Sequence, residues 1–348
     1  MIMNIYEQDI FSQPKDIREA LNFYVDNHYG EKIQKISEKK FSKIILTGMG
    51  SSYSACMNAN TILRNSGLPC TVEPASQLLH YEIPSIDNDT LLVIVSQSGR
   101  SGEIVELIEK LSVPCTVVAL TNDEESPLGK RADLLLNLHV KTEQAVSTRT
   151  YLAPIVLMHL FACAYVGKYN DVLVNSLNTS LDYLEESIGD FDELGQKMKA
   201  FFALPPYVAL IGRGYDMSTV DGGALFIKEV AKYPSIPFDA GQFRHGPFEM
   251  IGSGFTAIFF ATEGVGCEMQ LRLAKDVAAK GSKVIVVTDS DQISDSENIL
   301  VVHQKYASPE LACVVNILPV QCFGNYIAGA QGLKVGEFLF SNKITTVQ

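Results

Sequence analysis

The chain has 348 residues, long enough for two domains or for one large domain with a sizeable core. Hydrophobic residues make up 47% and charged residues 20%, as in ordinary globular proteins, and the formal net charge of −12 argues against a nucleic-acid partner. No uninterrupted apolar run approaches the ~18 residues of a membrane span, and the N-terminus is no signal peptide. We therefore expect a cytoplasmic protein that binds no membrane.

The seven cysteines predict neither a metal site nor a disulfide framework. They are odd in number, are scattered along the chain, and form no Cys-x-x-Cys pair. Most lie among apolar neighbours, as Cys115 does beside Pro114 and Val117, which is typical of small core residues. We expect no metal and no cofactor.

The first half of the chain predicts a helical segment followed by alternating strands and helices. Ile17, Leu21 and Tyr24 recur at helical intervals within residues 4–38. The strand candidates that follow are apolar throughout rather than alternating, which is typical of buried parallel strands. We expect strands at 43–47, 70–73, 91–95, 116–120 and 134–138, and a long apolar helix at about 151–166.

The same order of elements then begins again. Strands are expected at 207–211, 255–261, 283–289 and 299–302, with a helix ending near 231 and a helical stretch at 309–333. Three strand ends match their counterparts at a nearly constant spacing along the chain: Gly48 with Gly212, Gly99 with Gly264, and Thr121 with Thr288. This match predicts a duplication, and so an α/β fold of two tandem units, each a parallel sheet flanked by helices.

These patterns also predict where the parts of the chain begin and end. We expect an N-terminal helical segment at 1–38, the first unit at 39–168, the second at 169–333 and a C-terminal tail at 334–348. Each unit opens with a Gly-x-Gly that does not continue to the full Gly-x-Gly-x-x-Gly, because position 53 is Tyr and position 217 is Met. Nicotinamide binding is therefore not expected.

A polar loop follows the predicted strand at 91–95. Its sequence, Ser-Gln-Ser-Gly-Arg-Ser at 96–101, leads into an amphipathic helix, and the N-terminus of a helix favours an anion. The loop lacks the lysine of nucleotide-binding Gly-Lys-Ser/Thr loops, and an N-capping turn is the structural alternative. The second copy has Arg213, Tyr215 and Glu263 at the matching strand ends, so we assign a phosphate pocket to the first copy.

Two residues of the second copy are candidates for acid–base chemistry. Glu229 lies among small and apolar neighbours on a predicted helix, where loss of hydration would raise the pKa of its carboxyl group. An ion pair with Lys228 or Lys232 is the alternative interpretation. His245 lies in a loop with Gly and Pro, where an imidazole is accessible to a ligand or is simply exposed.

Four motifs occur in the order found in the sugar isomerase (SIS) family, which the chain resembles over nearly its whole length. They are Gly-Met-Gly-Ser-Ser at 48–52, Ser-Gln-Ser-Gly-Arg-Ser at 96–101, Lys-Glu at 228–229 with His-Gly-Pro at 245–247, and Asn-Lys-Ile-Thr-Thr-Val at 342–347. The chain resembles in particular the isomerase half of glucosamine-6-phosphate synthase. It also resembles stand-alone amino-sugar-phosphate deaminases and fructosamine-6-phosphate deglycases.

The resemblance implies roles for the matching residues and a tail that closes the active site. Glu229 would move a proton between sugar C1 and C2, His245 would assist ring opening from the neighbouring subunit of a homodimer, and Lys343 would form a Schiff base with the open-chain keto sugar. The phosphate of a hexose 6-phosphate derivative would bind Ser52, Ser96, Gln97, Ser98 and Ser101, and the sugar would bind Ser51, Ser147 and Thr148. Without the resemblance, the sequence alone favours a solvent-exposed charge near the C-terminus at Lys343.

Departures from the synthase pattern narrow the expected reaction. The chain begins Met1-Ile2-Met3, without the cysteine that starts the synthase's glutaminase domain, so we do not expect glutamine-dependent synthesis. Gly222 and Phe226 stand where the synthase has an acid and a lysine, and Leu339 stands where it has an arginine. We therefore expect an enzyme that cleaves the C–N bond of an amine-bearing hexose 6-phosphate, as a deglycase or a deaminase.

Two alternative functions stay open. A plain aldose–ketose isomerase of a phosphosugar needs no amine pocket, which is compatible with Gly222 and Phe226. A non-catalytic phosphosugar sensor, of the kind found in transcription regulators with SIS modules, is the alternative from another class. Such sensors usually carry a helix-turn-helix domain and a single SIS copy, whereas this chain has two copies and both Glu229 and His245.

Overall fold

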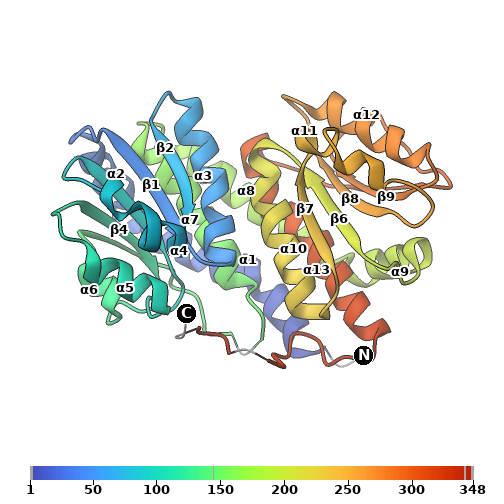
Figure 1. Ribbon diagram of the computed structural model, residues 1–348, viewed down its shortest axis with the longest axis horizontal. Coiled ribbons are helices and arrows are strands. Elements are labelled where there is room, and N and C mark those ends of the chain that lie inside the picture. The colour runs from blue at the N-terminus through green and yellow to red at the C-terminus, as the bar shows by residue number, and fades with distance from the viewer. Residues whose placement is uncertain (1–2, 144, 341, 346–348) are drawn as a thin grey trace. The chain divides into compact units, whose positions relative to one another are not determined.

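The computed structural model describes residues 3–143, 145–340 and 342–345, which form two compact units (Figure 1). The first unit comprises residues 15–175 and 338–345, and the second comprises residues 3–14 and 176–337. The divisions fall within helix α1 (Ile5–Asp26), within helix α8 (Asp171–Ile188) and within the predicted tail. The outermost ends of the predicted segments 1–38 and 334–348 lie outside the described residues.

The first unit contains the five-stranded parallel sheet that the sequence predicts. The strand order is β2-β1-β3-β4-β5. After β1 the chain adds β2 on one side of it and then β3, β4 and β5 in turn on the other side. Every predicted strand is confirmed to within one residue. The strands are β1 (Lys43–Gly48), β2 (Cys70–Pro74), β3 (Thr90–Val95), β4 (Thr116–Thr121) and β5 (Leu134–Asn137).

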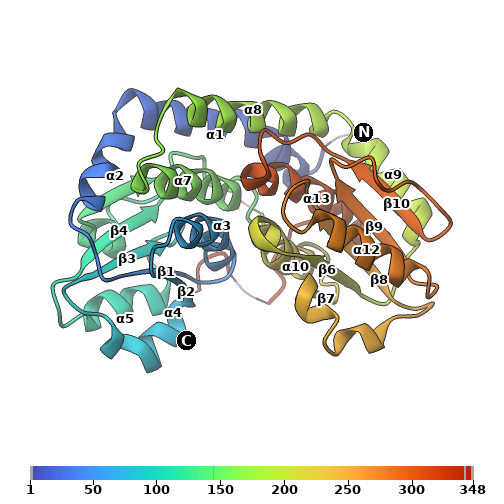
Figure 2. The ribbon, with the colours of Figure 1, turned by 90° about the horizontal axis from the view of Figure 1, so that it is seen from above.

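Helices cover both faces of this sheet, which explains its continuously apolar strands. Ile104 and Leu107 of one helix pack with Leu92 and Ile94 on one face, while α3 and α7 lie on the other face (Figure 2). Strand β3 is consequently buried along its whole length. The helices of the unit after α1 are α2 (Tyr29–Ser37), α3 (Ser51–Asn65), α4 (Ala75–Gln77), α5 (Gly102–Lys110), α6 (Pro127–Arg131) and α7 (Arg149–Tyr165).

Helix α7 is the apolar helix expected at about 151–166, and all of its residues are buried. It packs against α3, where the ring nitrogen Nδ1 of His159 lies 3.1 Å from Oδ1 of Asn58. Burial lowers the pKa of His159 to about 4. The imidazole is therefore neutral at physiological pH and satisfies a buried amide oxygen.

The second unit repeats the topology of the first, which confirms the predicted duplication. Its five parallel strands follow the order β10-β9-β8-β6-β7, the counterpart of β5-β4-β3-β1-β2 in the first unit. Gly50 and Gly214 occupy equivalent positions after the first strand of each copy, and both have a positive φ, +54° and +61°. The strands are β6 (Val208–Gly212), β7 (Ser235–Asp239), β8 (Thr256–Ala261), β9 (Lys283–Thr288) and β10 (Ile299–His303).

Some elements of the second unit were not predicted. Strand β7 is short, lies at the edge of the sheet and contains Pro237, so it lacks a clear apolar pattern. Helices α8 and α9 (Phe191–Phe202) follow α7 without the Gly-x-Gly signal of a new unit. The remaining helices of the second unit are α10 (Met217–Ala231), α11 (Ala240–Phe243), α12 (Cys267–Ala278) and α13 (Ala312–Ala330).

Helix α13 corrects one expectation about apolar stretches. Among the described residues, Pro309–Ala330 is one stretch long and apolar enough to cross a membrane by length and composition. The helix itself was expected, but its apolar length was overlooked because Asn316 and Gln321 interrupt the apolar run. In the most apolar 18-residue segment of this stretch, 89% is buried inside the protein. The helix packs against α10, as expected of a core helix.

All seven cysteines are buried and carry free thiols, in agreement with their apolar neighbours. Burial raises the pKa of the Cys322 thiol to about 12 and that of the Cys267 thiol to about 11. These thiols therefore stay protonated at neutral pH and behave as small apolar core groups.

The neutral His159 predicts a specific loss of stability in acid. The unfolded chain binds a proton near the ordinary pKa of 6.5, whereas the folded chain binds it only near 4, so stability falls as pH drops from 6.5 to 4. This shift corresponds to roughly 3 kcal/mol at its full extent. We expect the His159→Asn variant, which keeps a donor toward Asn58, to lose correspondingly less stability between pH 7 and pH 4.5 in urea titrations. Equal losses in both proteins would contradict this.

Candidate active site

The candidate site lies where strands β1 and β3 of the first unit end side by side. The two strands are paired in parallel, with Thr47 opposite Ile94, and the helices that follow them, α3 and α5, cover opposite faces of the sheet. A crevice at the carboxyl ends of the strands is the usual ligand site in such a sheet. Gly48 lets the strand ends approach, because a Cβ atom there would lie 2.8 Å from the carbonyl oxygen of Val95.

A small pocket of about 90 Å³, partly open to solvent, occupies this position. Seven of the eight residues predicted to bind phosphate or sugar line it, and Lys343 of the tail lines it as well. Among the described lining residues, Lys343 is the only charged one. The lining consists of Met49, Ser51, Ser52, Val95, Ser96, Gln97, Ser98, Ser101, Ile104, Ser147 and Lys343.

The pocket lies between the N-termini of two helices. Ser51 and Ser52 form the first turn of α3, and Ser101 immediately precedes α5. The backbone N–H groups of a first helical turn lack partners within the helix and carry partial positive charge. The pocket therefore offers hydroxyl groups and a favourable electrostatic potential to an anion such as a phosphate group.

The loop between β3 and α5 is held in place by its own bonds. Gly99 has φ +61°, and a Cβ atom there would lie 2.1 Å from Oγ of Ser126, so only glycine fits this position. The backbone N–H of Asn122 donates to the carbonyl oxygen of Gln97 at 2.9 Å. Arg100 is exposed and forms an ion pair with Asp123 at 2.7 Å, and hydrogen bonding to that guanidinium lowers the pKa of Asp123. Arg100 therefore contributes to the surface rather than to the pocket lining.

The tail lysine is joined to a buried carboxylate that was not among the predicted site residues. Nζ of Lys343 lies 3.0 Å from Oε2 of Glu143 and donates to the carbonyl oxygen of Ala145, also at 3.0 Å. Lys343 is therefore no free terminal charge; 20% of its side chain is exposed. The sequence signal for Glu143 was its place at the start of the motif that also holds Ser147 and Thr148.

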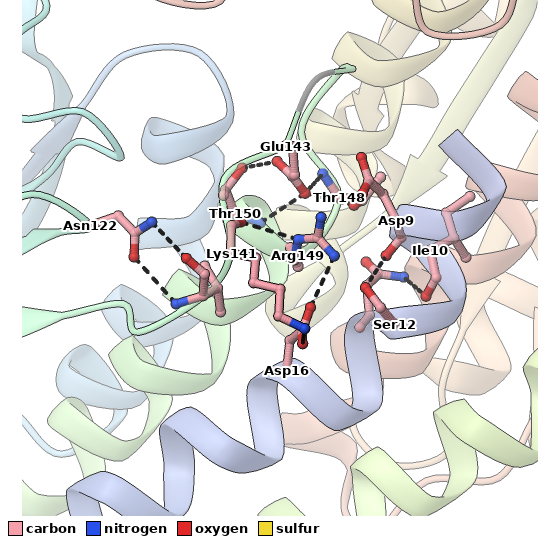
Figure 3. Close-up of polar contacts among 12 residues, drawn as sticks. Asp9, Ile10, Ser12, Asp16, Asn122, Lys141, Glu143, Thr148, Arg149 and Thr150 are labelled. Atoms are coloured by element: carbon pink, nitrogen blue, oxygen red, sulfur yellow. Dashed lines mark hydrogen bonds and ion pairs between the residues drawn. The ribbon is translucent and has the colours of Figure 1, made fainter. Parts of the chain in front are cut away.

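Thr148, the eighth predicted residue, does not line the pocket. Its hydroxyl donates to Oε1 of Glu143 at 2.7 Å and its backbone N–H donates to the same oxygen at 2.9 Å (Figure 3). The hydroxyl of Thr150 donates to the other oxygen, Oε2. Thr148 therefore supports the loop that carries Ser147.

The arginine between these threonines fixes the same loop to α1. Arg149 is buried and pairs with the buried carboxylate of Asp16, with 2.9 Å between NH1 and Oδ2 (Figure 3). Its Nε atom donates to the carbonyl oxygen of Lys141 at 3.2 Å. The segment that carries Glu143 and Ser147 is thus anchored at both ends by polar contacts.

The predicted acid–base residues lie in the second unit. Glu229 is on α10 and is half-buried. Lys232, just after α10, donates from Nζ to the main-chain oxygen of Glu229 at 2.6 Å, and burial lowers the pKa of this lysine. His245 lies in the turn after α11 and is exposed.

The strand ends of the second unit carry a different chemistry. Asp216 is fully buried and accepts hydrogen bonds from Thr262 at 3.1 Å and from Asn316 at 2.9 Å. Burial raises the pKa of Asp216 to about 6, against these bonds, which lower it. The Asp289 carboxylate meanwhile accepts the backbone N–H of Glu263 at 2.8 Å. Carboxylates at this edge disfavour an anion, which is consistent with a phosphate pocket in the first copy.

A metal site is not apparent in the part of the chain that the structure describes. There, no three His, Cys, Asp or Glu side chains come together closely enough to hold a metal ion. The donors at the pocket are hydroxyl, amide and amine groups, which suit an anionic or carbonyl ligand better than a cation.

The fold and the site define a tandem α/β protein with a polar pocket at a parallel-sheet switch point. The SIS domain model matches residues 35–164 and residues 206–323, one stretch for each sheet. The chain therefore belongs to the SIS domain family, the family that its motifs predicted.

Individual relatives agree with this assignment. The chain is 29% identical over 342 residues to a glutamine–fructose-6-phosphate aminotransferase of Pyrococcus horikoshii, covering 93% of this chain and 54% of the relative. It thus spans about half the length of the curated relatives it matches. Among solved structures, the C-terminal domain of glucosamine-fructose-6-phosphate aminotransferase from Francisella tularensis has TM-score 0.87 at 19% identity, with 97% of this chain and 98% of that one covered.

A second solved structure shares the fold at similar coverage. Glucosamine-6-phosphate deaminase from Thermotoga maritima has TM-score 0.79 at 18% identity and covers 98% of this chain and 99% of that one. At such identities the likeness establishes the common fold.

The geometry around Gly99 predicts how two glycine substitutions will differ. Gly67 and Gly99 both have a left-handed φ, but a Cβ atom at Gly67 would meet nothing within 4 Å. We expect Gly67→Ala to cost about 1–2 kcal/mol through backbone strain alone. Gly99→Ala adds the collision with Ser126 and should cost at least about 1 kcal/mol more, because crowding of a packed site is destabilising.

If the 96–101 loop binds phosphate, we expect glucose 6-phosphate to stabilise the parent and Gly67→Ala against heat, but not Gly99→Ala. Thermal melts with and without glucose 6-phosphate test both points. Retained stabilisation in Gly99→Ala would show that the 96–101 loop does not bind the phosphate.

Proposed function

We propose that this chain is an enzyme that cleaves the C–N bond of an amine-bearing hexose 6-phosphate, as a deglycase or a deaminase. The observation that carries the proposal is that a lysine amine and a serine-rich loop line the same pocket. Ser96, Gln97 and Ser98 offer hydrogen bonds to a phosphate, while Nζ of Lys343 offers a nucleophile to a carbonyl or imine carbon.

In this proposal the phosphate anchors the substrate. Ser52, Ser96, Gln97, Ser98 and Ser101 would hold it at the N-termini of α3 and α5. Ser51 and Ser147 would contact the sugar, and Thr148 would act through Glu143. Binding energy gained at the phosphate, remote from C1 and C2, can then orient the reacting carbons.

Proton transfer between C1 and C2 would prepare the C–N bond for cleavage. Glu229 would take a proton from one carbon and return it to the other, which oxidises the C–N single bond to an imine and reduces the neighbouring carbonyl to an alcohol. No external oxidant is required, because the redox change is internal to the sugar. By the resemblance to the synthase, His245 would assist ring opening from the neighbouring subunit of a homodimer.

Lys343 would then exchange with the amine of the substrate. Its Nζ, as a free amine, adds to the imine carbon, and the substrate's nitrogen leaves as a protonated amine. Water hydrolyses the lysine imine to a carbonyl and returns Nζ. In sum, one water is consumed, and one hexose 6-phosphate and one amine are released.

Departures from the synthase pattern support cleavage over synthesis. Phe226 stands where the synthase has a lysine, and it is buried, so this position provides an apolar ring instead of an ammonium group. Leu339, in place of an arginine, is 53% exposed. A plain aldose–ketose isomerase is the alternative that these positions also allow, and the same experiment decides between them.

A coupled assay for glucose 6-phosphate and fructose 6-phosphate tests the proposal. The substrates are glucosamine 6-phosphate, fructoselysine 6-phosphate, glucoselysine 6-phosphate and fructose 6-phosphate alone. We expect product only from amine-bearing compounds. The Glu229→Gln variant should lose at least about 100-fold in kcat, the usual scale for a general base, while glucose 6-phosphate still stabilises it against heat.

Glu193→Gln, the same change at an exposed position of α9, serves as the control and should retain full turnover. Interconversion of unsubstituted hexose phosphates alone would make the chain an isomerase. Phosphosugar binding without turnover on any compound would favour a sensor.

A further inference from the structure

The Glu143 carboxylate is fully buried, yet five donors surround it. Oε1 accepts the backbone N–H and hydroxyl of Thr148 and the backbone N–H of Thr150. Oε2 accepts the hydroxyl of Thr150 and Nζ of Lys343. A buried carboxylate is costly unless its oxygens are hydrogen-bonded, and here both oxygens accept hydrogen bonds. The Glu143 carboxylate is therefore held in a fixed position, where it forms an ion pair with the pocket-lining Lys343.

This charge determines how the lysine nitrogen is presented. Nζ is within 3.0 Å of two acceptors, Oε2 of Glu143 and the carbonyl oxygen of Ala145. A lysine nitrogen has four tetrahedral positions: one is its bond to carbon, and these acceptors take two more. The fourth carries either the last proton of the ammonium group or the lone pair of the amine. Lys343 lines the pocket, so its side chain is accessible to a ligand there.

The described tail residues around Lys343 bury little apolar surface. Asn342, Ile344 and Thr345 are exposed, and Phe340 is 98% exposed. A main-chain bond links the tail to α5, where the backbone N–H of Gly102 donates to the carbonyl oxygen of Thr345 at 3.2 Å. Polar contacts therefore contribute more to holding this segment than apolar packing does.

We propose that Glu143 is the positioning residue of the tail: its buried charge seats Lys343 and so completes the pocket. The same carboxylate orders the loop of Ser147 through Thr148 and Thr150, so one group joins the sugar-side loop to the tail. The consequence for turnover rests on the function proposed for Lys343. The seating of the tail does not, and the two can be tested separately.

Two substitutions separate the charge of Glu143 from its size. Glu143→Gln keeps the volume and one oxygen for Thr148, but places an NH₂ group near Nζ and the Thr150 hydroxyl. That hydroxyl can rotate to accept, whereas an ammonium group has no acceptor to offer. Glu193→Gln makes the same change at an exposed position of α9 and leaves every contact of Glu143 intact, which makes it the matched control. Lys343→Met breaks the same contact from the tail side.

Hydrogen exchange of the tail amides measures whether Lys343 is held in place, independently of catalysis. In Glu143→Gln and in Lys343→Met, we expect amides of the tail and of Gly102 to exchange about tenfold faster or more, because a hydrogen bond to a charged group contributes about that factor. The double variant should be no faster than either single one. Glu193→Gln should exchange as the parent does.

The turnover rate then measures how the position of Lys343 affects the reaction. With the substrate found in the coupled assay, Glu143→Gln should lose about 100-fold or more in kcat, the cost of misplacing a reacting group by about 1 Å, with KM changed far less. Glu193→Gln should stay close to the parent.

Unchanged tail exchange in Lys343→Met would contradict the proposal that the contact of Lys343 with Glu143 holds the tail in place. This variant decides the question even if Glu143→Gln fails to fold. Faster exchange in Glu143→Gln with unchanged kcat would overturn its role in positioning the amine. If the parent turns over no substrate, the proposed function fails while the exchange result for the tail still stands.

Discussion

The pairing of β1 with β3 is the constraint on which the site depends. Parallel pairing brings their carboxyl ends to one edge of the sheet. Because β2 and β3 lie on opposite sides of β1, the helices α3 and α5 that follow β1 and β3 cover opposite faces. Two helix N-termini then converge on one space, which no helix or sheet packing fills. Gly48 permits the close approach of the strand ends. Serines that directly follow β1 and β3 in sequence therefore line this space together.

Duplication gave the chain two such edges, and their side chains have diverged. The first edge carries uncharged hydroxyl groups, with one lysine brought in by the tail. The second carries Asp216, buried and hydrogen-bonded, and Asp289, which accepts a backbone N–H. An anion is favoured at the first edge and repelled at the second, although the backbone topology is the same. Specialisation therefore lies in the residues that follow the strands.

Patterns local in sequence predicted most of the fold, while contacts between distant segments escaped them. Apolar strands buried on both faces, and the glycines after them, were sufficient for nine of the ten strands. Strand β7 was missed because Pro237 and its edge position remove the apolar signal. Seven of the eight predicted binding residues line one pocket. Glu143 was overlooked because its partner Lys343 is 200 positions away, and no periodicity links them.

The most direct test of a single phosphosugar site in the first copy is hydrogen exchange with and without glucose 6-phosphate. The account predicts slower exchange at residues 96–104 and 49–54, no change at the matching residues 262–268, and no protection by glucose, which lacks the phosphate. Protection at 262–268 alone, or equal protection by glucose, would contradict it.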